Sequence, residues 1–384
     1  MTLSNIPLRI GIEARATVYE KRGIGRFALE IINALAKIAP ENEYFLFTDT
    51  KMAERVAPGC INILVERGIA SWIHWDLYCM AKRMKIDLMF FPANNCWFYP
   101  ACPTVVGLLD MAPFIYREKF YVDRKTTAYY YINYFSIKKA SDRIITISEY
   151  SKNDIRKFLK VSIDKIDVIY LAASNTFQTL SDKKRALSDL KSKYKIPDKY
   201  MLFVGGLDFR KNINNLIDAF ILLKQRKSIS HGLVLVGPSE SGLGLLYPSY
   251  KEIVKQKNLE DDVVIPGRVS DEDLIKFYNC ADVFVFPSFM EGFGIPPLEA
   301  MSCGCPVVAS KVTSIPEVVG DAAVLVDPYD VQDIANGIEK VLYDLNLRKE
   351  LIARGFERVN LFSWEKAAKL LLSTFYRTID RSLL

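Results

Sequence analysis

Two glutamates stand in an otherwise uncharged stretch near residue 300, which reads FPSFMEGFGIPPLEAMSCGCPVVAS. Seven uncharged residues separate Glu291 from Glu299. One carboxylate can accept hydrogen bonds from both hydroxyls of a ribose, and a second can face a sugar. The pair therefore suits a nucleotide sugar, with Glu299 at the ribose and Glu291 at the sugar. Alternatively, Glu299 only faces a helix dipole and Glu291 is an exposed loop carboxylate.

The residues around this pair predict a loop between a strand and a helix. The hydrophobic run 282–287 predicts a strand that ends at Pro287, and Pro296–Pro297 are expected to open a helix. Glu291 then lies on the loop and Glu299 in the first helical turn. In a parallel sheet such loops lie at the carboxyl edge, where ligands bind, and glycines there let the backbone approach a phosphate closely.

A basic pair follows an earlier hydrophobic run, in the segment GGLDFRKNINNL. Arg210 and Lys211 would lie just after the strand 201–206, at the same edge of the sheet as the glutamates. Cations in this position can neutralise the charge that develops on a departing diphosphate. A basic pair on a loop is usually only solvated, so its location beside the glutamates is what favours a role.

Short hydrophobic runs alternate with helical patterns along the chain, which predicts parallel sheets covered by helices on both faces. The expected strands are 8–12, 44–48, 87–91, 104–109, 143–147 and 167–171, then 201–206, 233–237, 263–267, 282–287, 306–310 and 323–327. We expect two Rossmann-like, doubly wound domains at 1–175 and 200–362, joined by a polar linker at 176–199, with a ligand cleft between them. The closing segment 363–384 is expected to be an amphipathic helix that packs back on the first domain.

Composition sets broad limits on the class of protein. The chain has 384 residues, 50% of them hydrophobic and 25% charged, which indicates a water-soluble protein of two domains. Its net charge of +6 permits an anionic partner. Seven scattered cysteines indicate reduced thiols in the cytosol, and Cys303 and Cys305 are too close together for a zinc site. Without a signal peptide or a membrane-spanning run, we expect a cytoplasmic protein whose only membrane contact is peripheral.

In their order along the chain, these motifs resemble glycosyltransferase family 4, retaining enzymes with the GT-B fold of two Rossmann-like domains facing a cleft. The stretch from FPSFMEGFGIPPLEAM to AVLVDP resembles the donor-site signature, with Glu291 and Glu299 as its E-x7-E element. VGGLDFRKN resembles the phosphate-binding turn, FSWEKAA the terminal helix, and ASDRIITISEYSKNDI a stretch late in the first domain. The resemblance covers nearly the whole chain and is strongest over 201–330.

The resemblance implies that a sugar is transferred from a nucleotide-diphosphate sugar, with retention at the anomeric carbon and without a metal or other cofactor. Carried over, Glu291 faces the donor sugar as a catalytic residue, while Arg210 and Lys211 hold the diphosphate and act on its departure. Glu299 would hold the ribose. Further donor-binding positions, where backbone groups would meet the ligand, are Gly206, Gly292, Phe293, Gly294 and Ile295.

The same resemblance suggests a substrate class. The RKN turn together with GFGIPPLEAM is most similar to mannosyltransferases, which makes GDP-mannose the first candidate donor and UDP-hexoses the second. The expected acceptor is a lipid-linked or oligosaccharide molecule of cell-surface polysaccharide synthesis, met at the inner face of the membrane.

Two departures from the family pattern affect these expectations. Leu109 stands where many members have a histidine, so Asp110 remains a candidate site residue without that neighbour. Gly206 occupies a position that is arginine in some members, which leaves Arg210 as the expected phosphate partner. The leucine also supports an alternative, a non-catalytic protein that binds nucleotide sugars, although Glu291 beside a full phosphate site speaks against it.

Two features of the first domain concern the acceptor side. In RGIGRFA, Gly23 and Gly25 precede a helix and would form a glycine turn at the cleft, where we also count them among the residues that bind the nucleotide sugar. Their spacing also fits a loose dinucleotide fingerprint, but the preceding strand ends too early for the tight turn that this fingerprint needs.

The segment 116–140 contains six basic and eight aromatic residues. It is either a helix with aromatic rings in the core, or a surface patch for anionic lipid headgroups. Nucleic-acid binding is disfavoured because the basic residues form no run.

Overall fold

Two parallel sheets, one in each unit of the chain, organise this protein. The computed structural model describes residues 7–19, 23–50, 56–66, 72–121, 123–226, 229–238 and 248–382. The first unit comprises Met1–Leu171 and Ser363–Leu384, and the second comprises Ala172–Phe362. Every strand pair in both sheets is parallel.

The first sheet has seven strands in the order β3-β2-β1-β4-β5-β6-β7. They are β1 (Arg9–Glu13), β2 (Glu43–Thr48), β3 (Cys60–Leu64), β4 (Leu88–Phe91), β5 (Thr104–Gly107), β6 (Arg143–Thr146) and β7 (Ile166–Val168). The predicted strands are confirmed to within a few residues, whereas β3 was not predicted. It lies at the edge of the sheet beside β2 alone and most of its residues face solvent. Asn62 interrupts its hydrophobic residues, so it does not read as the continuous run of a buried strand. The order reverses between β1 and β4, which makes their carboxyl ends the switch point of this sheet.

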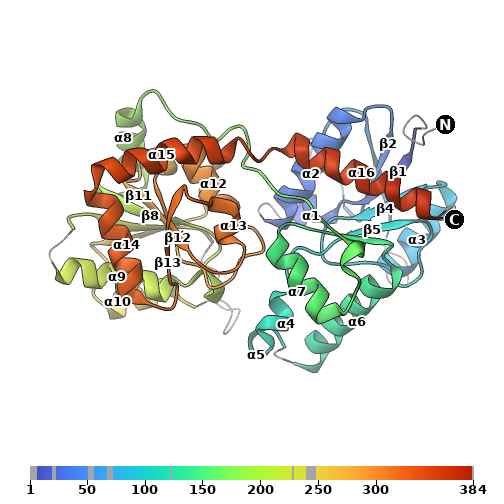
Figure 1. The fold of residues 1–384 in the computed structure, drawn as a ribbon, viewed down its shortest axis with the longest axis horizontal. Coiled ribbons are helices and arrows are strands. Elements are labelled where there is room, and N and C mark those ends of the chain that lie inside the picture. Colours follow the sequence, from blue (N-terminus) through green and yellow to red (C-terminus); the bar gives the residue numbers. More distant parts are fainter. Residues whose placement is uncertain are drawn as a thin grey trace. The chain divides into compact units, whose positions relative to one another are not determined.

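Helices cover both faces of the first sheet (Figure 1). They are α1 (Arg15–Tyr19), α2 (Ile24–Ile38), a π-helical turn η2 (Trp72–Asp76), α3 (Leu77–Arg83), α4 (Ala112–Ile115), α5 (Arg117–Phe120), α6 (Arg124–Ala140), α7 (Glu149–Leu159), η3 (Ile163–Lys165) and α16 (Trp364–Ser382). Neighbouring residues of β4 point to opposite faces: Phe90 meets Phe375 of α16, at 5.5 Å between ring centroids, while Phe91 joins the core beneath α3, α6 and α7. The terminal helix α16 belongs to this unit and packs against α2.

The second sheet has six strands in the order β10-β9-β8-β11-β12-β13. They are β8 (Tyr200–Val204), β9 (Gly232–Val236), β10 (Val263–Gly267), β11 (Val283–Phe286), β12 (Val307–Ser310) and β13 (Ala323–Val326). Each coincides with a predicted strand. The inner strands β8, β9, β11 and β12 are fully buried and therefore read as continuous hydrophobic runs, and the edge strands β10 and β13 are also hydrophobic in sequence although less buried. The switch point lies between β8 and β11, which pair directly, with Val283 opposite Met201.

The helices of the second unit are α8 (Lys183–Tyr194), η4 (Phe209–Lys211), α9 (Ile213–Gln225), α10 (Tyr250–Gln256), α11 (Asp271–Cys280), α12 (Ile295–Ser302), α13 (Ile315–Val319), α14 (Val331–Tyr343) and α15 (Leu345–Val359). In Figure 1, α9 and α14 lie side by side. The stretch 176–199, expected as a linker, instead contains α8, which packs on α11 through Ala186 and Leu190. Only these two residues of α8 are buried, so the helix reads as a polar run. No helix in the described ranges combines the length and hydrophobicity needed to cross a bilayer.

Candidate active site

The loops that carry the candidate residues meet at the switch point of the second sheet. The β8–α9 loop contains Arg210 and Lys211, and the β11–α12 loop contains Glu291. The backbone carbonyl of Arg210 accepts a hydrogen bond from the Phe289 backbone N–H at 2.8 Å, which joins the two loops. The expectation that the basic pair and Glu291 share one edge of the sheet is therefore confirmed. Ligands of doubly wound folds bind at such switch points.

Lys211 and Glu291 form a close ion pair. The ammonium Nζ lies 2.7 and 2.8 Å from the two carboxylate oxygens, and the side chains are only 14% and 11% exposed. Glu291 is thus not the exposed loop carboxylate of the alternative interpretation. Nζ also lies 5.7 Å from the centroid of the Phe286 ring. An ammonium has three N–H donors, so one remains for a ligand while two hold the carboxylate.

Arg210 is held in place by a residue that sequence analysis missed, Asp208. The guanidinium Nε donates to Asp208 Oδ1 at 2.8 Å, and the Arg210 backbone N–H donates to the same oxygen at 3.1 Å. Burial raises the pKa of the Asp208 carboxyl, but Arg210 and Lys211 outweigh it, so this pKa lies below its ordinary value. Asp208 therefore stays ionised and fixes the arginine. Its signal in the sequence was the Asp-Phe-Arg spacing, which is typical of a side chain capping a turn.

Asn212, also missed, ties three loops together. Its backbone is in the left-handed region with φ of 59°, which asparagine tolerates better than most residues. Its Nδ2 donates to the carbonyl of Pro287 at 3.0 Å and to that of Pro328 at 2.6 Å. The ends of β8, β11 and β13 are therefore braced against one another, which keeps the basic pair in register with Glu291.

Two side chains after β12 support the backbone around Glu291. Ser314 Oγ donates to the carbonyls of Glu291 and Phe293, both at 3.0 Å, and Thr313 Oγ1 accepts from the Glu291 N–H at 3.3 Å. The Phe293 ring is buried, so this residue can offer a ligand only backbone atoms. Gly292 beside it is half-buried.

Helix α12 begins one residue earlier than expected. Gly294 caps it with φ of 100°, a conformation that favours glycine, and Ile295 is its first residue. Glu299 is consequently the fifth helical residue, so its predicted place in the first turn is wrong. Prolines are accommodated at Pro296 and Pro297 because first-turn N–H groups have no helical acceptor.

Glu299 is buried, with 4% of its surface exposed. One carboxylate oxygen accepts a hydrogen bond from the hydroxyl of Tyr278, on α11, at 2.9 Å. Tyr278 is fully buried and was missed by sequence analysis. A buried carboxylate is costly unless it is hydrogen-bonded, so this contact offsets part of the cost of burying Glu299.

The remaining candidates take separate places. Gly206 follows β8, and a side chain there would meet Asp208 Oδ2 at 3.6 Å. In the first unit, Gly23 caps α2 with φ of 61°, whereas Gly25 lies inside α2 and not in the preceding turn as expected. Asp110 follows β5, and its Oδ1 accepts from the Ala112 N–H at 2.9 Å.

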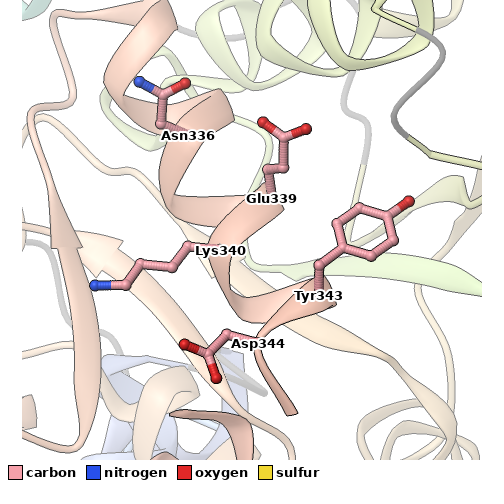
Figure 2. A pocket seen from close by; sticks show the side chains of 5 residues that line it. All are labelled: Asn336, Glu339, Lys340, Tyr343 and Asp344. Carbon is pink, nitrogen blue, oxygen red and sulfur yellow. The ribbon is translucent and has the colours of Figure 1, made fainter. Parts of the chain in front are cut away.

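A surface depression elsewhere on the second unit is a poor ligand site. Figure 2 shows it on α14, lined by Asn336, Glu339, Lys340, Tyr343 and Asp344. Asn336 and Glu339 already accept hydrogen bonds from Arg226, and Lys340 and Tyr343 point in different directions. Because α14 returns across the sheet after β13, its last turn lies at the edge opposite to Glu291.

Comparison with known proteins gives one consistent result. A family model described as "Glycosyl transferases group 1" matches residues 188–358. Serotype-specific mannosyltransferase WbdA of Escherichia coli is 33% identical over 296 residues, 76% of this chain but 35% of that protein, so the chain spans about a third of its length. O-antigen chain mannosyltransferase B of Escherichia coli is 30% identical over 386 residues, covering 93% of this chain and 96% of that protein.

The solved structure of sucrose-phosphate synthase from Thermosynechococcus elongatus superimposes with a TM-score of 0.75 and 21% identity, over 97% of this chain and 99% of that one. This match shows the fold, and the relationship to O-antigen chain mannosyltransferase B extends over both units. The resemblance inferred from the motifs is thereby confirmed. The chain belongs to the group 1 glycosyltransferases and has the GT-B fold of two Rossmann-like domains.

Proposed function

We propose that this protein is a retaining, family 4 glycosyltransferase that moves a hexose from a nucleotide-diphosphate sugar to a glycan acceptor in polysaccharide synthesis. The observation that carries the proposal is the largely buried Lys211–Glu291 pair beside Arg210 at the switch point of the second sheet. It supplies cationic donors for a diphosphate and a carboxylate for a sugar within one loop cluster.

In the proposed reaction, the bond between the anomeric carbon and the diphosphate oxygen breaks while the acceptor oxygen attacks from the same face. The acceptor proton passes to the departing phosphate oxygen. Negative charge grows on the diphosphate as this bond breaks, so Arg210 and Lys211 bind the transition state more strongly than the substrate. Glu291 stays close enough to orient the sugar hydroxyls, and Glu299 receives the ribose hydroxyls.

GDP-mannose is the proposed donor. Support comes from the two Escherichia coli relatives, which are both named mannosyltransferases. A UDP-hexose is the second candidate.

We propose that Arg210 and Lys211 do the work that a divalent cation does in metal-dependent transferases. Within the described part of the chain, no three His, Cys, Asp or Glu side chains are grouped so that they could hold a metal. Activity should therefore survive dialysis against EDTA. Loss of turnover that Mg²⁺ or Mn²⁺ restores would contradict this point.

We further propose that α6 rests on an anionic lipid surface, as a lipid-linked acceptor requires. Tyr134 and Ile137 of this helix are buried. The opposite side carries exposed large apolar residues between basic residues at both ends: Tyr129, Tyr131, Ile132 and Phe135, with Arg124, Lys125, Lys138 and Lys139. Of the aromatic residues in segment 116–140, only some therefore lie in the core, as the first of the two interpretations expected for all of them. Aromatic rings favour the interface, and cations attract anionic headgroups.

Liposome flotation tests the lipid contact. The protein should float with vesicles of phosphatidylcholine containing phosphatidylglycerol, and the variant Ile132→Ser/Phe135→Ser should not. A matched control is Tyr343→Ser/Leu345→Ser, which removes two apolar side chains from the second unit that are at least as exposed. Equal flotation of all three proteins would show that α6 is not the lipid-binding surface.

A non-catalytic nucleotide-sugar-binding protein is the second candidate, favoured by one observation. Leu109 is buried, and its backbone N–H donates to Asn94 Oδ1 at 2.9 Å, so an apolar side chain fills the place of the family's histidine. Thermal-shift screening against GDP- and UDP-sugars, followed by turnover with octyl glycosides as acceptors, separates the candidates. Glu291→Ala should abolish transfer while nucleotide affinity changes only a few fold. Binding without turnover on any acceptor would support the second candidate, and no nucleotide binding would refute both.

A further inference from the structure

A buried carboxylate marks the switch point of the first sheet. Glu13 is the last residue of β1 and is 1% exposed. The neighbouring strand β4 ends at Phe91, and Asn95 lies on the loop that follows it. By topology, β1 and β4 correspond to β8 and β11 of the second sheet, whose following loops carry Arg210 and Glu291. Burial of a charge is costly and is a poor way to gain stability, so its presence at a ligand-binding edge points to recognition.

Arg15 neutralises Glu13 and is itself held rigidly. Its Nε lies 2.6 Å from Glu13 Oε1, which also accepts the Arg15 backbone N–H at 3.1 Å. The guanidinium carbon lies 4.2 Å from the centroid of the Trp72 ring, over which it stacks. In the described structure, Nε is the only side-chain nitrogen of Arg15 with a hydrogen bond, and the side chain is 20% exposed. The terminal amino groups of the guanidinium therefore remain available as pre-oriented donors.

Asn95 adds an acceptor. Its Nδ2 donates to Glu13 Oε2 at 3.4 Å, which fixes the orientation of the amide. Its Oδ1 is buried and has no hydrogen-bond partner within the described ranges. Buried amide oxygens almost always have a donor, so this one indicates a hydroxyl or a water that belongs at the site.

We propose that Glu13, Arg15 and Asn95 form the subsite that recognises hydroxyl groups on the terminal sugar of the acceptor. The inference rests on the proposed function. The guanidinium donates and the amide oxygen accepts, which matches the paired donor and acceptor character of a sugar hydroxyl. Because Glu13 cancels the charge of Arg15, the cluster favours a neutral polyol over a phosphate or the diphosphate linkage of a lipid carrier. Arg15 and Asn95 are contact residues, and Glu13 is a positioning residue.

The test uses octyl α-glycosides of mannose, glucose, galactose and N-acetylglucosamine as acceptor probes, with GDP-mannose and UDP-glucose as donors. For the best probe, Asn95→Ala should raise the acceptor KM about threefold to tenfold, and Arg15→Lys about tenfold. The donor KM and the Tm should change little. The control is Arg9→Lys at the opposite end of β1, where Arg9 is likewise ion-paired, to Glu43, and stacks over Phe45 at 4.7 Å.

Monodeoxy versions of the best probe identify the sugar hydroxyl that donates a hydrogen bond to Asn95. One deoxy probe should bind more weakly than its parent to the wild-type protein but equally well to Asn95→Ala, as measured by saturation-transfer NMR on the sugar protons. Unchanged acceptor KM in both variants overturns the subsite while leaving the transferase intact. Donor consumption by a wild type that binds none of the glycosides also overturns it. A wild type that neither binds nor consumes a nucleotide sugar refutes the proposed function, and the subsite with it.

Discussion

Replacing Lys211 by methionine separates its part in catalysis from its part in stability. Methionine keeps the length and volume of the side chain but removes the ammonium that contacts both oxygens of Glu291. Two effects should follow, because the diphosphate loses a cation and Glu291 loses its partner. A second substitution, Glu291→Gln, should reverse the loss of stability but not the loss of activity.

The catalytic effect should be the larger. Loss of one pre-oriented donor to a developing negative charge lowers kcat by about 10²–10³, or ~2.7–4 kcal/mol. Arg210 remains to bind the diphosphate, so donor KM should change less than tenfold.

The stability effect follows from burial. Breaking a fully buried ion pair costs about 3–5 kcal/mol, and an exposed pair contributes about 0–1 kcal/mol. With Lys211 and Glu291 exposed by 14% and 11%, we expect an intermediate loss. We place it at about 1–3 kcal/mol, which lowers the Tm by about 2–12 °C for a unit of this size.

The assay compares initial rates and thermal melts of Lys211→Met, Lys211→Met/Glu291→Gln and Lys224→Met. The double variant should recover most of the lost Tm, because no unpaired carboxylate remains, yet its kcat should stay low. Lys224 pairs with Asp262 at 2.7 Å, is about a third exposed, and lies at the far end of α9, so its variant should keep kcat within twofold. If Lys211→Met retains kcat within threefold, or if the double variant regains it, Lys211 has no role in the transition state.

Three further outcomes follow from the same site. The cationic neighbours of Asp208 hold the pKa of its carboxyl below the ordinary value despite burial. The carboxylate therefore stabilises the folded state above about pH 4, and this stability is lost as the pH falls through the folded pKa. Asp208→Asn should therefore be less stable at neutral pH and show a smaller loss between pH 5 and pH 2 in urea melts; a wild-type pH profile would contradict this. Gly294→Ala should lose about 1–3 kcal/mol of unfolding free energy and bind nucleotide more weakly in calorimetry, because its φ is 100° and its Cβ would lie 2.6 Å from Ile315 Cδ1. Tyr278→Phe should cost about 1–3 kcal/mol in urea melts by removing a donor from the buried Glu299, and a neutral result would mean that the hydroxyl is dispensable.

The sequence predicted helices and strands correctly wherever the hydrophobic pattern of a short segment reflects its burial. Twelve strands could be placed because each is a short hydrophobic run, most of them buried on both faces, and their alternation with helices predicted both sheets. Segments with weaker hydrophobic patterns were misjudged. Asn62 interrupts the hydrophobic residues of β3, and α8 buries only Ala186 and Leu190, so neither carries the pattern of its element.

The ordered motifs also indicated the residues of the site and the family, because loops after parallel strands must gather at one edge of the sheet. What the motifs could not reveal were the partners, since these depend on which distant backbone and side-chain atoms meet. Asn212 bonds a carbonyl 116 residues away, Tyr278 reaches Glu299 from another helix, and Glu13 meets Asn95 across 82 residues. Sequence by itself thus determined most helices and strands, the edge of the sheet at which the site lies, and the charged residues that gather there. Only the tertiary structure decided that Lys211 forms an ion pair with Glu291, and that a neutral Glu13–Arg15 pair lies at the switch point of the first sheet. The reason is that hydrogen bonds and ion pairs depend on a separation of a few ångströms in space, which distance along the chain does not determine.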